Sequence, residues 1–244
     1  MSIKSVKVCL SPALLPLFEL ADTTAVVIDI FRATSSMCFG LANGAQAIIP
    51  VAEIEECLSY KEKGYLLAAE RDGLVVKGFD FGNSPRSYTS ENVAGKTVVL
   101  TTTNGTKAIK LCEQAKKTVI GSFLNISALT QWLIKQDGHI LLVCSGWKNH
   151  MCLEDTVFAG AVVNSFDSNK VEFDDAAYAA QELYLNARSD LHSFLTQAAH
   201  FKRMESLNIE ADIAFCLQED LVTAIPTMEN GKLVRIPEYI PTAQ

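Results

Sequence analysis

The chain has 244 residues, of which 49% are hydrophobic and 20% charged, and its formal net charge is −7 with a pI near 5.2. This length suits one large domain, or a domain with a small lobe, and the apolar fraction can supply a buried core. The acidic balance argues against nucleic acid or an anionic membrane as the main partner. A small anionic ligand stays open, because a local arginine or a metal ion outweighs a diffuse negative surface.

Cysteine usage and the amino terminus point to a cellular compartment. The seven cysteines, an odd number without paired spacing, are typical of reduced thiols. The segment MSIKSVKVCLSPALL lacks the layout of a signal peptide, and no apolar run of about 18 residues is present to span a membrane. We therefore expect a cytoplasmic protein with no membrane partner.

Apolar runs that alternate with helical patterns predict the α/β fold class. We expect strands at 6–10, 25–30, 47–51, 65–69, 97–101, 118–121 and 139–144, and helices at 53–63, 107–114, from 122 and at 153–164. This alternation favours a largely parallel sheet covered on both faces. Residues 174–220 read as a mainly helical subregion, followed by terminal strands at 222–225 and 233–236. No repeat or linker interrupts the chain, so we expect a single domain over 1–244.

The stretch from 25 to 43, AVVIDIFRATSSMCFGLAN, holds the first candidate site residues. A short buried strand leads directly into Asp29, and Arg32, Thr34 and Ser35 precede a helical pattern. Ligands of open α/β sheets bind at the carboxyl ends of strands, and helix N-termini favour anions. A metal and a phosphate would suit this stretch, although capping of the helix by Asp29, with Arg32 as its ion-pair partner, explains the same residues.

Three other strands are also expected to end in polar residues. They are followed by Glu70, by the turn from Thr102 to Thr106, and by Cys144-Ser145-Gly146, while Glu154 and Asp155 begin the next helix. Strand ends of a parallel sheet lie along one edge, so these groups should converge. Several carboxylates without a Cys/His cluster suit Mg²⁺. The alternative for Glu154 and Asp155 is ordinary stabilisation of a helix start.

Two loops complete the candidate site. The turn TTNGT offers hydroxyls, a glycine and free N–H groups at a helix start, which suits a phosphate or carboxylate, and a plain β–α turn is the alternative. Residues 71–90 are rich in Gly, Asn, Ser and Pro, and we interpret them as a long functional loop.

Several known chemistries are excluded by the residues. A cysteine phosphatase needs Cys-x5-Arg, but the position that follows Cys144 at this spacing is His150. An aspartyl-phosphate enzyme of the haloacid dehalogenase type needs a second Asp where this chain has Phe31. Gly-x-Ser-x-Gly, the Walker loop and Gly-x-Gly-x-x-Gly are all absent. His150 and His200 are isolated in the sequence, so we expect them to be structural or on the surface.

Five segments occur together in an order that resembles one family, the 2-phosphosulfolactate phosphatases, also called ComB. They are DIFRATSS, ERDGLVVKGFDFGNSP, TTTNGTKA, CSGW and LEDTVFAGAVV, between about residues 26 and 163. The resemblance implies a three-layer α/β/α fold with a largely parallel, mixed sheet. It also implies a Mg²⁺-dependent phosphatase that hydrolyses 2-phosphosulfolactate to 3-sulfolactate and phosphate, a step in coenzyme M biosynthesis.

Site residues follow from this resemblance position by position. Asp29, Arg32 and Thr34 match the family's D-x-F-R-A-T, and Glu70 matches the glutamate of G-E-R-x-G, although Ala69 stands where a glycine is expected. The remaining matches are Asn83 and Ser84 in N-S-P, Thr103, Asn104, Gly105 and Thr106 in T-N-G-T, and Glu154 and Asp155 in E-D. No role is implied for residues 200–220.

The chemistry of these groups gives a mechanism. We expect Mg²⁺ on Asp29, Glu70 and Glu154 or Asp155, with Arg32, Glu154 and Asp155 joining Asp29 as catalytic groups. Thr34, Ser35, Asn83, Ser84, Ser145 and the residues 103–106 should bind the substrate. Arg71 or Arg86 should receive its carboxylate or sulfonate. The attacking group is either a metal-activated water or Asp29 as a transient aspartyl phosphate.

Alternatives remain in substrate and in class. The substrate could be another 2-phospho-hydroxy-acid, or the chain could bind a phosphorylated ligand without catalysis. A dinucleotide-binding enzyme is disfavoured by the missing glycine motif. We expect a small anionic phosphorylated substrate as partner, no nucleic acid, and a homodimer.

Overall fold

The strands and helices alternate along most of the computed structural model, which describes residues 2–207 and 209–236. Its strands are β1 (Ile3–Cys9), β2 (Thr23–Ile28), β3 (Ala47–Pro50), β4 (Leu66–Arg71), β5 (Leu74–Val75), β6 (Thr97–Thr101), β7 (Lys117–Gly121), β8 (Gly138–Cys144), β9 (Glu172–Phe173), β10 (Pro226–Glu229) and β11 (Lys232–Arg235). Its α-helices are α1 (Ala33–Ala42), α2 (Ile54–Leu58), α3 (Ser90–Val93), α4 (Gly105–Leu111), α5 (Ile126–Leu133), α6 (Leu153–Val163), α7 (Asp175–Ala187), α8 (Leu191–Leu195), α9 (Ala199–Ser206) and α10 (Glu210–Cys216). Short 3-10 helices are η1 (Pro12–Leu17), η2 (Lys61–Lys63), η3 (Pro85–Ser87) and η4 (Phe123–Asn125).

The strands form one mixed sheet in the order β5-β4-β6-β3-β11-β10-β7-β2-β8-β1-β9. Two groups of parallel strands, β4-β6-β3 and β7-β2-β8-β1-β9, are joined by the antiparallel hairpin β10–β11. The hairpin meets each group at a single residue pair, Thr227 with Val119 and Leu233 with Ile48. The mostly parallel pairing expected from the sequence is therefore confirmed, but the carboxyl-terminal hairpin divides it in two.

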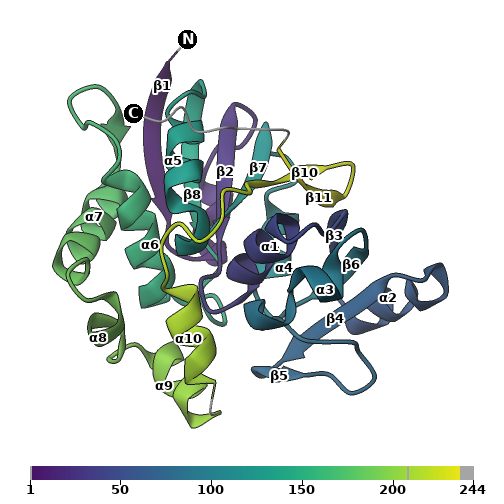
Figure 1. Ribbon diagram of the computed structural model, residues 1–244. Helices are drawn as coiled ribbons and strands as arrows, with labels where there is room; N and C mark the ends of the chain where they lie inside the picture. Colours follow the sequence, from purple (N-terminus) through teal and green to yellow (C-terminus); the bar gives the residue numbers. More distant parts are fainter. Residues whose placement is uncertain (1, 208, 237–244) are drawn as a thin grey trace.

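Side chains of alternate strand residues enter two different cores, which produces three layers. On β2, Val26 and Ile28 pack with α5 and α6, while Ala25 and Val27 pack with α1 and α4. A smaller apolar cluster under α2 covers the outer strands β4 and β6. Figure 1 shows α6 and α7 along one side of the sheet and α1, α3 and α4 along the other. The predicted α/β/α architecture is confirmed.

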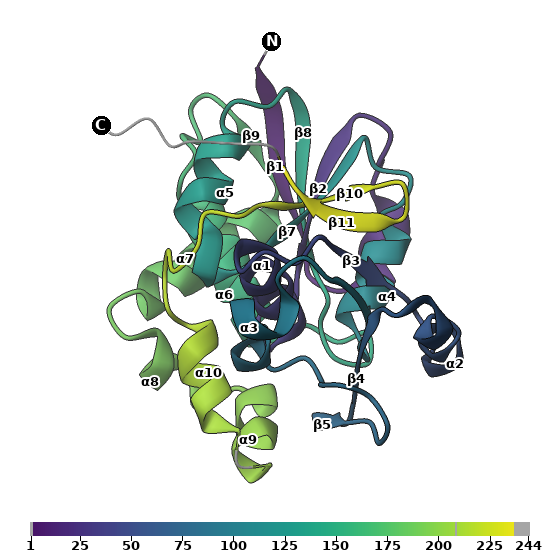
Figure 2. The same ribbon diagram turned by 45° about the vertical axis from the view of Figure 1, so that its right-hand side comes forward.

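The helices α7 to α10 fill the region expected to be helical, and they bring the late part of the chain to the functional edge. In Figures 1 and 2, α8, α9 and α10 lie at the end of the molecule toward which β1 runs. Ile213 and Cys216 of α10 are buried in the same core as α6, and Phe215 meets Phe39 of α1 with ring centroids 5.0 Å apart. Helix α10 is thus fixed against the helix that follows β2.

Three details differ from the sequence prediction. The expected strand at 222–225 is wrong. Val222 N–H donates to the Leu124 carbonyl and the Ala224 carbonyl accepts from Asn125, so hydrogen bonds hold this segment beside η4. Strand pairing begins only at Pro226. Glu70 lies within β4 rather than after it. The loop expected over 71–90 contains β5 and η3.

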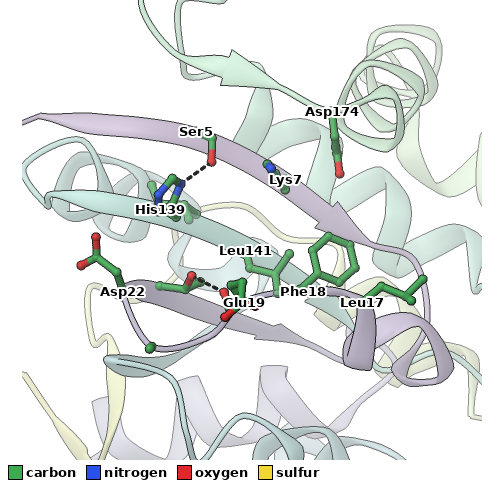
Figure 3. A pocket seen from close by; sticks show the side chains of 12 residues that line it. Ser5, Lys7, Leu17, Phe18, Glu19, Asp22, His139, Leu141 and Asp174 are labelled. Carbon is green, nitrogen blue, oxygen red and sulfur yellow. Dashed lines mark hydrogen bonds between the residues drawn. The ribbon is translucent and has the colours of Figure 1, made fainter.

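A wide cavity of about 560 Å³ lies away from the strand ends that carry the candidate residues. Figure 3 shows its lining from β1, the segment before β2 and the start of β8. Its polar contacts are local, with Ser5 Oγ and His139 Nδ1 2.8 Å apart and Thr23 Oγ1 donating to the Glu19 carbonyl at 2.7 Å. None of the predicted site residues lines this cavity. Within the described ranges, no helix is long and apolar enough to cross a membrane.

Candidate active site

The turn after β2 is held by its own hydroxyl groups. Thr34 Oγ1 donates to the Asp29 carbonyl at 2.9 Å and accepts from the Asp29 N–H at 3.1 Å, while Ser35 Oγ donates to the Ile30 carbonyl at 3.0 Å. Both hydroxyl side chains are fully buried. They therefore position Asp29, and the substrate-binding role predicted for Thr34 and Ser35 gains no support from this geometry.

The carboxylate of Asp29 lies at a close approach between two strand ends. A Cβ added to Gly105, which follows β6, would lie 2.8 Å from Asp29 Oδ2 and 2.8 Å from the Ala33 Cβ. Only glycine fits here without displacing its neighbours. The carboxyl ends of β2 and β6 therefore meet, although the hairpin β10–β11 separates their groups in the sheet.

Neighbouring acids change the chemistry of Asp29. Burial raises the pKa of Asp29 to about 6, His200 acts against this rise, and the charges of Glu70 and Glu154 add to it. Three carboxylates from distant parts of the chain are thus close enough to influence one another. Such a set favours a cation that would offset their charge.

Glu70 reaches the same place from β4. Its Oε1 accepts from the Gly73 N–H at 2.5 Å, and its Oε2 lies 3.4 Å from both the N–H and the Oγ1 of Thr103. Asp29, Glu70, Asn83 and Asn104 line a closed cavity of about 20 Å³, together with Phe31, Arg32, Gly73, Trp147, His200, Arg203, Met204 and Leu207. This volume holds about one water molecule.

The two acids at the start of α6 have different surroundings. Asp155 accepts from the Ile30 N–H at 2.9 Å and from the Gly146 N–H at 3.1 Å, so it ties together the loops after β2 and β8. Burial, with the charges of Glu154 and Asp29, raises the pKa of Asp155. Backbone donors thus contact both Asp155 oxygens, as they contact both Glu70 oxygens, and the ligand role expected for Asp155 stays a prediction.

Glu154 is the acid of this pair with an oxygen that accepts no hydrogen bond from the described residues. Its Oε1 lies 2.6 Å from His200 Nδ1, and its Oε2 is buried without a hydrogen-bond partner among the described residues. Cys152, Glu154 and His200 have ligand atoms within 4.8 Å of one another. Among the described residues, they are the group of His, Cys, Asp or Glu side chains close enough together to hold a metal ion. His200, expected to be structural or on the surface, directly contacts a candidate ligand, which is compatible with that expectation.

Arg32 is buried and already paired. Its Nη1 donates to Asp212 Oδ2 at 2.5 Å, its Nη2 donates to the Gly73 carbonyl at 2.7 Å, and Ser84 Oγ donates to the other Asp212 oxygen at 2.8 Å. Helix α10 therefore helps to hold two predicted site residues, Arg32 and Ser84. No role was expected for this part of the chain.

Other predicted residues lie differently from expectation. Arg71 donates to the carbonyl groups of Glu70 and Ala52 and to Thr101 Oγ1, and it lines neither cavity at this edge, so the predicted anion-binding role for Arg71 is not supported. Thr106 and Thr102 hydrogen-bond each other's side chain and backbone. Arg86 is exposed and lies outside both cavities.

Orphaned polar atoms mark the same region. In the described chain, the buried side-chain atoms without a hydrogen-bond partner are Asn83 Oδ1, Ser145 Oγ, Glu154 Oε2 and Arg203 Nη1. Asn83, Glu154 and Arg203 line the closed cavity or its neighbour, and Ser145 directly follows β8. Buried polar groups are normally paired, so these atoms are open to a hydrogen bond from water or from a ligand.

Sequence reasoning missed the contribution of Trp147, His200 and Arg203. Trp147 belongs to the CSGW segment, and His200 and Arg203 are three residues apart on α9, a spacing that places them on one helix face. The Trp147 and His200 rings stack with centroids 6.1 Å apart, and the Arg203 guanidinium carbon lies 3.7 Å from the Trp147 ring centroid. The spacing of three residues between His200 and Arg203 indicated a shared helix face, but no local pattern showed that this face packs against Trp147, which follows β8.

Known proteins resemble this chain over most of its length. The family model of 2-phosphosulpholactate phosphatase matches residues 9–231. The chain belongs to the 2-phosphosulfolactate phosphatase family. Relatives named "probable 2-phosphosulfolactate phosphatase" include proteins of Thermotoga petrophila, 43% identical over 86% of this chain and 91% of the relative, and of Caldicellulosiruptor saccharolyticus, 41% identical over 86% and 91%. A third, from Clostridium acetobutylicum, is 38% identical over 88% of this chain and 94% of the relative. The resemblance and the enzyme class, a phosphoric monoester hydrolase, are confirmed.

Proposed function

We propose that this protein hydrolyses 2-phosphosulfolactate to 3-sulfolactate and inorganic phosphate with the help of Mg²⁺. The names of the relatives support the substrate. The observation that carries the proposal is the small cavity lined by Asp29, Glu70 and His200, because His200 contacts Glu154 at 2.6 Å and buried unpaired polar atoms lie in the same region. A place in coenzyme M biosynthesis stays a prediction from the resemblance.

Asp29, Glu70 and Glu154 offer the carboxylate oxygens that Mg²⁺ prefers together with water and substrate phosphate, and in this structure their ligand atoms do not all lie within 4.8 Å of one another. We propose Asp29, Glu70 and Glu154 as the residues that would hold the ion, with Glu154 preferred to Asp155 because its Oε2 is unpaired while backbone donors contact both Asp155 oxygens. When bound, the ion would offset negative charge that develops on the phosphoryl oxygens.

The chain's own residues would orient the phosphoryl group. Asn104 lines the closed cavity, and Gly105 lets the backbone at the start of α4 approach Asp29. Asn83 presents a buried, unpaired Oδ1 in the same cavity wall. Arg32, fixed by Asp212 and Gly73, would hold the loop after β2 in place rather than swing toward the substrate.

Two routes of bond exchange fit these residues. In one, a water oxygen bonds to phosphorus while the bond from phosphorus to the C2 oxygen breaks, and that oxygen leaves with a proton. In the other, an Asp29 carboxylate oxygen bonds to phosphorus while the bond from phosphorus to the C2 oxygen breaks and that oxygen leaves with a proton, and water then hydrolyses the aspartyl phosphate. Transfer of the phosphoryl group to an added alcohol supports the second route, and its absence supports the first.

Phosphate release tests the proposal. The wild-type protein should release phosphate from 2-phosphosulfolactate with Mg²⁺ and lose this activity in EDTA. Asp29→Asn should remove nearly all turnover with the fold intact, whereas Asp22→Asn, which changes an exposed acid that pairs with lysines, should behave as wild type. Wild-type turnover in Asp29→Asn would overturn the proposal. Faster release from 2-phospholactate would point to another 2-phospho-hydroxy-acid as substrate.

A further inference from the structure

A second cavity adjoins the closed one. It measures about 310 Å³ and is lined by Met151, Leu153 and Ala199 with His150, Cys152 and Glu154. Trp147, His200 and Arg203 line both this cavity and the closed one beside Asp29. These three side chains therefore form a wall between the acidic centre and a roomier space whose volume is in the range of small-molecule sites.

Arg203 is the unusual member of this wall. Its guanidinium group lies over the Trp147 ring, 3.7 Å from the ring centroid, and its Nη1 is buried without a hydrogen-bond acceptor among the described residues. Within that part of the chain no carboxylate comes within ion-pair distance of it. A buried guanidinium N–H without an acceptor is costly, and an incoming oxyanion would supply the acceptor.

The other arginines near the strand ends are already occupied. Arg32 donates to Asp212 and to the Gly73 carbonyl, and Arg71 donates to three acceptors. Arg203 Nη1 therefore lacks an acceptor among the described residues, whereas both Nη atoms of Arg32 and of Arg71 have one. Its position on the indole ring also fixes the plane of the guanidinium group, which reduces the freedom that binding must remove.

The acid that lines this cavity, Glu154, forms no ion pair with Arg203. Glu154 lines the second cavity, but its Oε1 is hydrogen-bonded to His200 Nδ1 at 2.6 Å. His200 is in turn stacked on Trp147, so it lies among the acid, the indole ring and the closed cavity. The cationic group exposed to the second cavity thus remains available for an anion.

We propose that Arg203, supported by Trp147, binds the sulfonate group of the substrate while the phosphoryl group lies beside Asp29. This inference rests on the function proposed above, and it names the residue that would distinguish a sulfonated substrate from a plain 2-phospho acid. A guanidinium group and a sulfonate are both weakly hydrated, and the apolar side chains of Met151, Leu153 and Ala199 suit a group of that kind better than a strongly hydrated one.

Two substrates distinguish sulfonate binding by Arg203 from a contact to the phosphoryl or carboxylate group. 2-Phosphosulfolactate and 2-phospholactate share the phosphoryl and carboxylate groups, and only the first has a sulfonate. Arg203→Met should lower kcat/KM for 2-phosphosulfolactate by about 10- to 100-fold, the loss typical of one charge-assisted contact, and change the value for 2-phospholactate by less than about threefold. Arg203→Lys, which keeps the charge without the planar fork, should fall between.

The control is Arg188→Met, which removes an exposed arginine at the end of α7 that lines neither cavity and should alter neither substrate. Equal losses on both substrates in Arg203→Met would overturn the proposal, since they would indicate a contact to the carboxylate or phosphoryl group, and no loss on either would overturn it too. Thermal unfolding of each variant separates these results from misfolding.

Calorimetric binding of 3-sulfolactate gives a readout that does not need turnover. Wild type should bind 3-sulfolactate more tightly than lactate, and Arg203→Met should lose this preference. If wild type releases phosphate from neither substrate yet keeps the preference, the proposed function fails and the Arg203 subsite stands. If wild type shows no preference for 3-sulfolactate, the subsite is refuted whatever the turnover results.

Discussion

Replacing Asp212 by alanine removes one half of an ion pair that ties helix α10 to the loop after β2. The side chains of Arg32 and Asp212 are each only 7% exposed, and their Nη1 and Oδ2 atoms are 2.5 Å apart. Ser84 would lose its acceptor at the same time. Removing one partner of a buried pair costs about 3–5 kcal/mol, because the remaining charge stays buried without compensation.

Urea unfolding checks this magnitude. With a slope of about 3 kcal/mol/M for a chain of this size, the midpoint for Asp212→Ala should fall by about 1–1.7 M. The double variant Arg32→Met with Asp212→Leu should recover most of this loss, because an apolar pair removes both buried charges. A midpoint shift below about 0.3 M in Asp212→Ala, at unchanged slope, would show that the pair does not hold α10 in place.

Gly105, Thr34 and the buried cysteines give three more predictions. Gly105→Ala should lower kcat by about tenfold or more while the protein stays folded, because the added Cβ would meet Asp29 Oδ2 and the Ala33 Cβ at 2.8 Å. Kinetics measures the loss of kcat and circular dichroism checks the fold, and a wild-type kcat would contradict the prediction. Thr34→Val should lower the free energy of unfolding by about 1–3 kcal/mol, since it removes the hydroxyl that both donates to and accepts from the Asp29 backbone. In the same urea experiment, Thr34→Ser should stay near wild type, and equal losses in the two variants would refute the role of the hydroxyl. All seven cysteines are buried, and burial raises the pKa of Cys9 to about 11 and of Cys38, Cys112 and Cys216 to about 12. A disulfide reagent should therefore modify the native protein slowly and the urea-unfolded protein at all seven positions. Rapid modification of the native chain would contradict this.

Much of the architecture was predictable because it depends on local patterns. The run TVVLT predicted β6 at its observed bounds, and Asp29 does follow a buried strand whose alternate side chains enter two cores. Ser122, expected to begin a helix, forms a capping box with Asn125. The hairpin β10–β11 was harder, because its two partners, β7 and β3, come from the first half of the chain.

The site was predictable where motifs are compact and not where distant residues complete them. Arg32 and Asp212 are separated by 180 positions, and Glu154 and His200 by 46, so no local pattern connects them. Asp155 and Glu154 are adjacent in sequence, and the helical rotation of about 100° per residue turns one toward backbone donors and the other toward the second cavity. Residue type alone could not assign these two tasks.

Titration with Mn²⁺, monitored by electron paramagnetic resonance, measures cation binding by the three distant carboxylates. We expect one ion bound per chain, with affinity reduced by at least about tenfold in Asp29→Asn, Glu70→Gln and Glu154→Gln and unchanged in Asp22→Asn. Unchanged affinity in any of the first three variants would contradict a site shared by these residues.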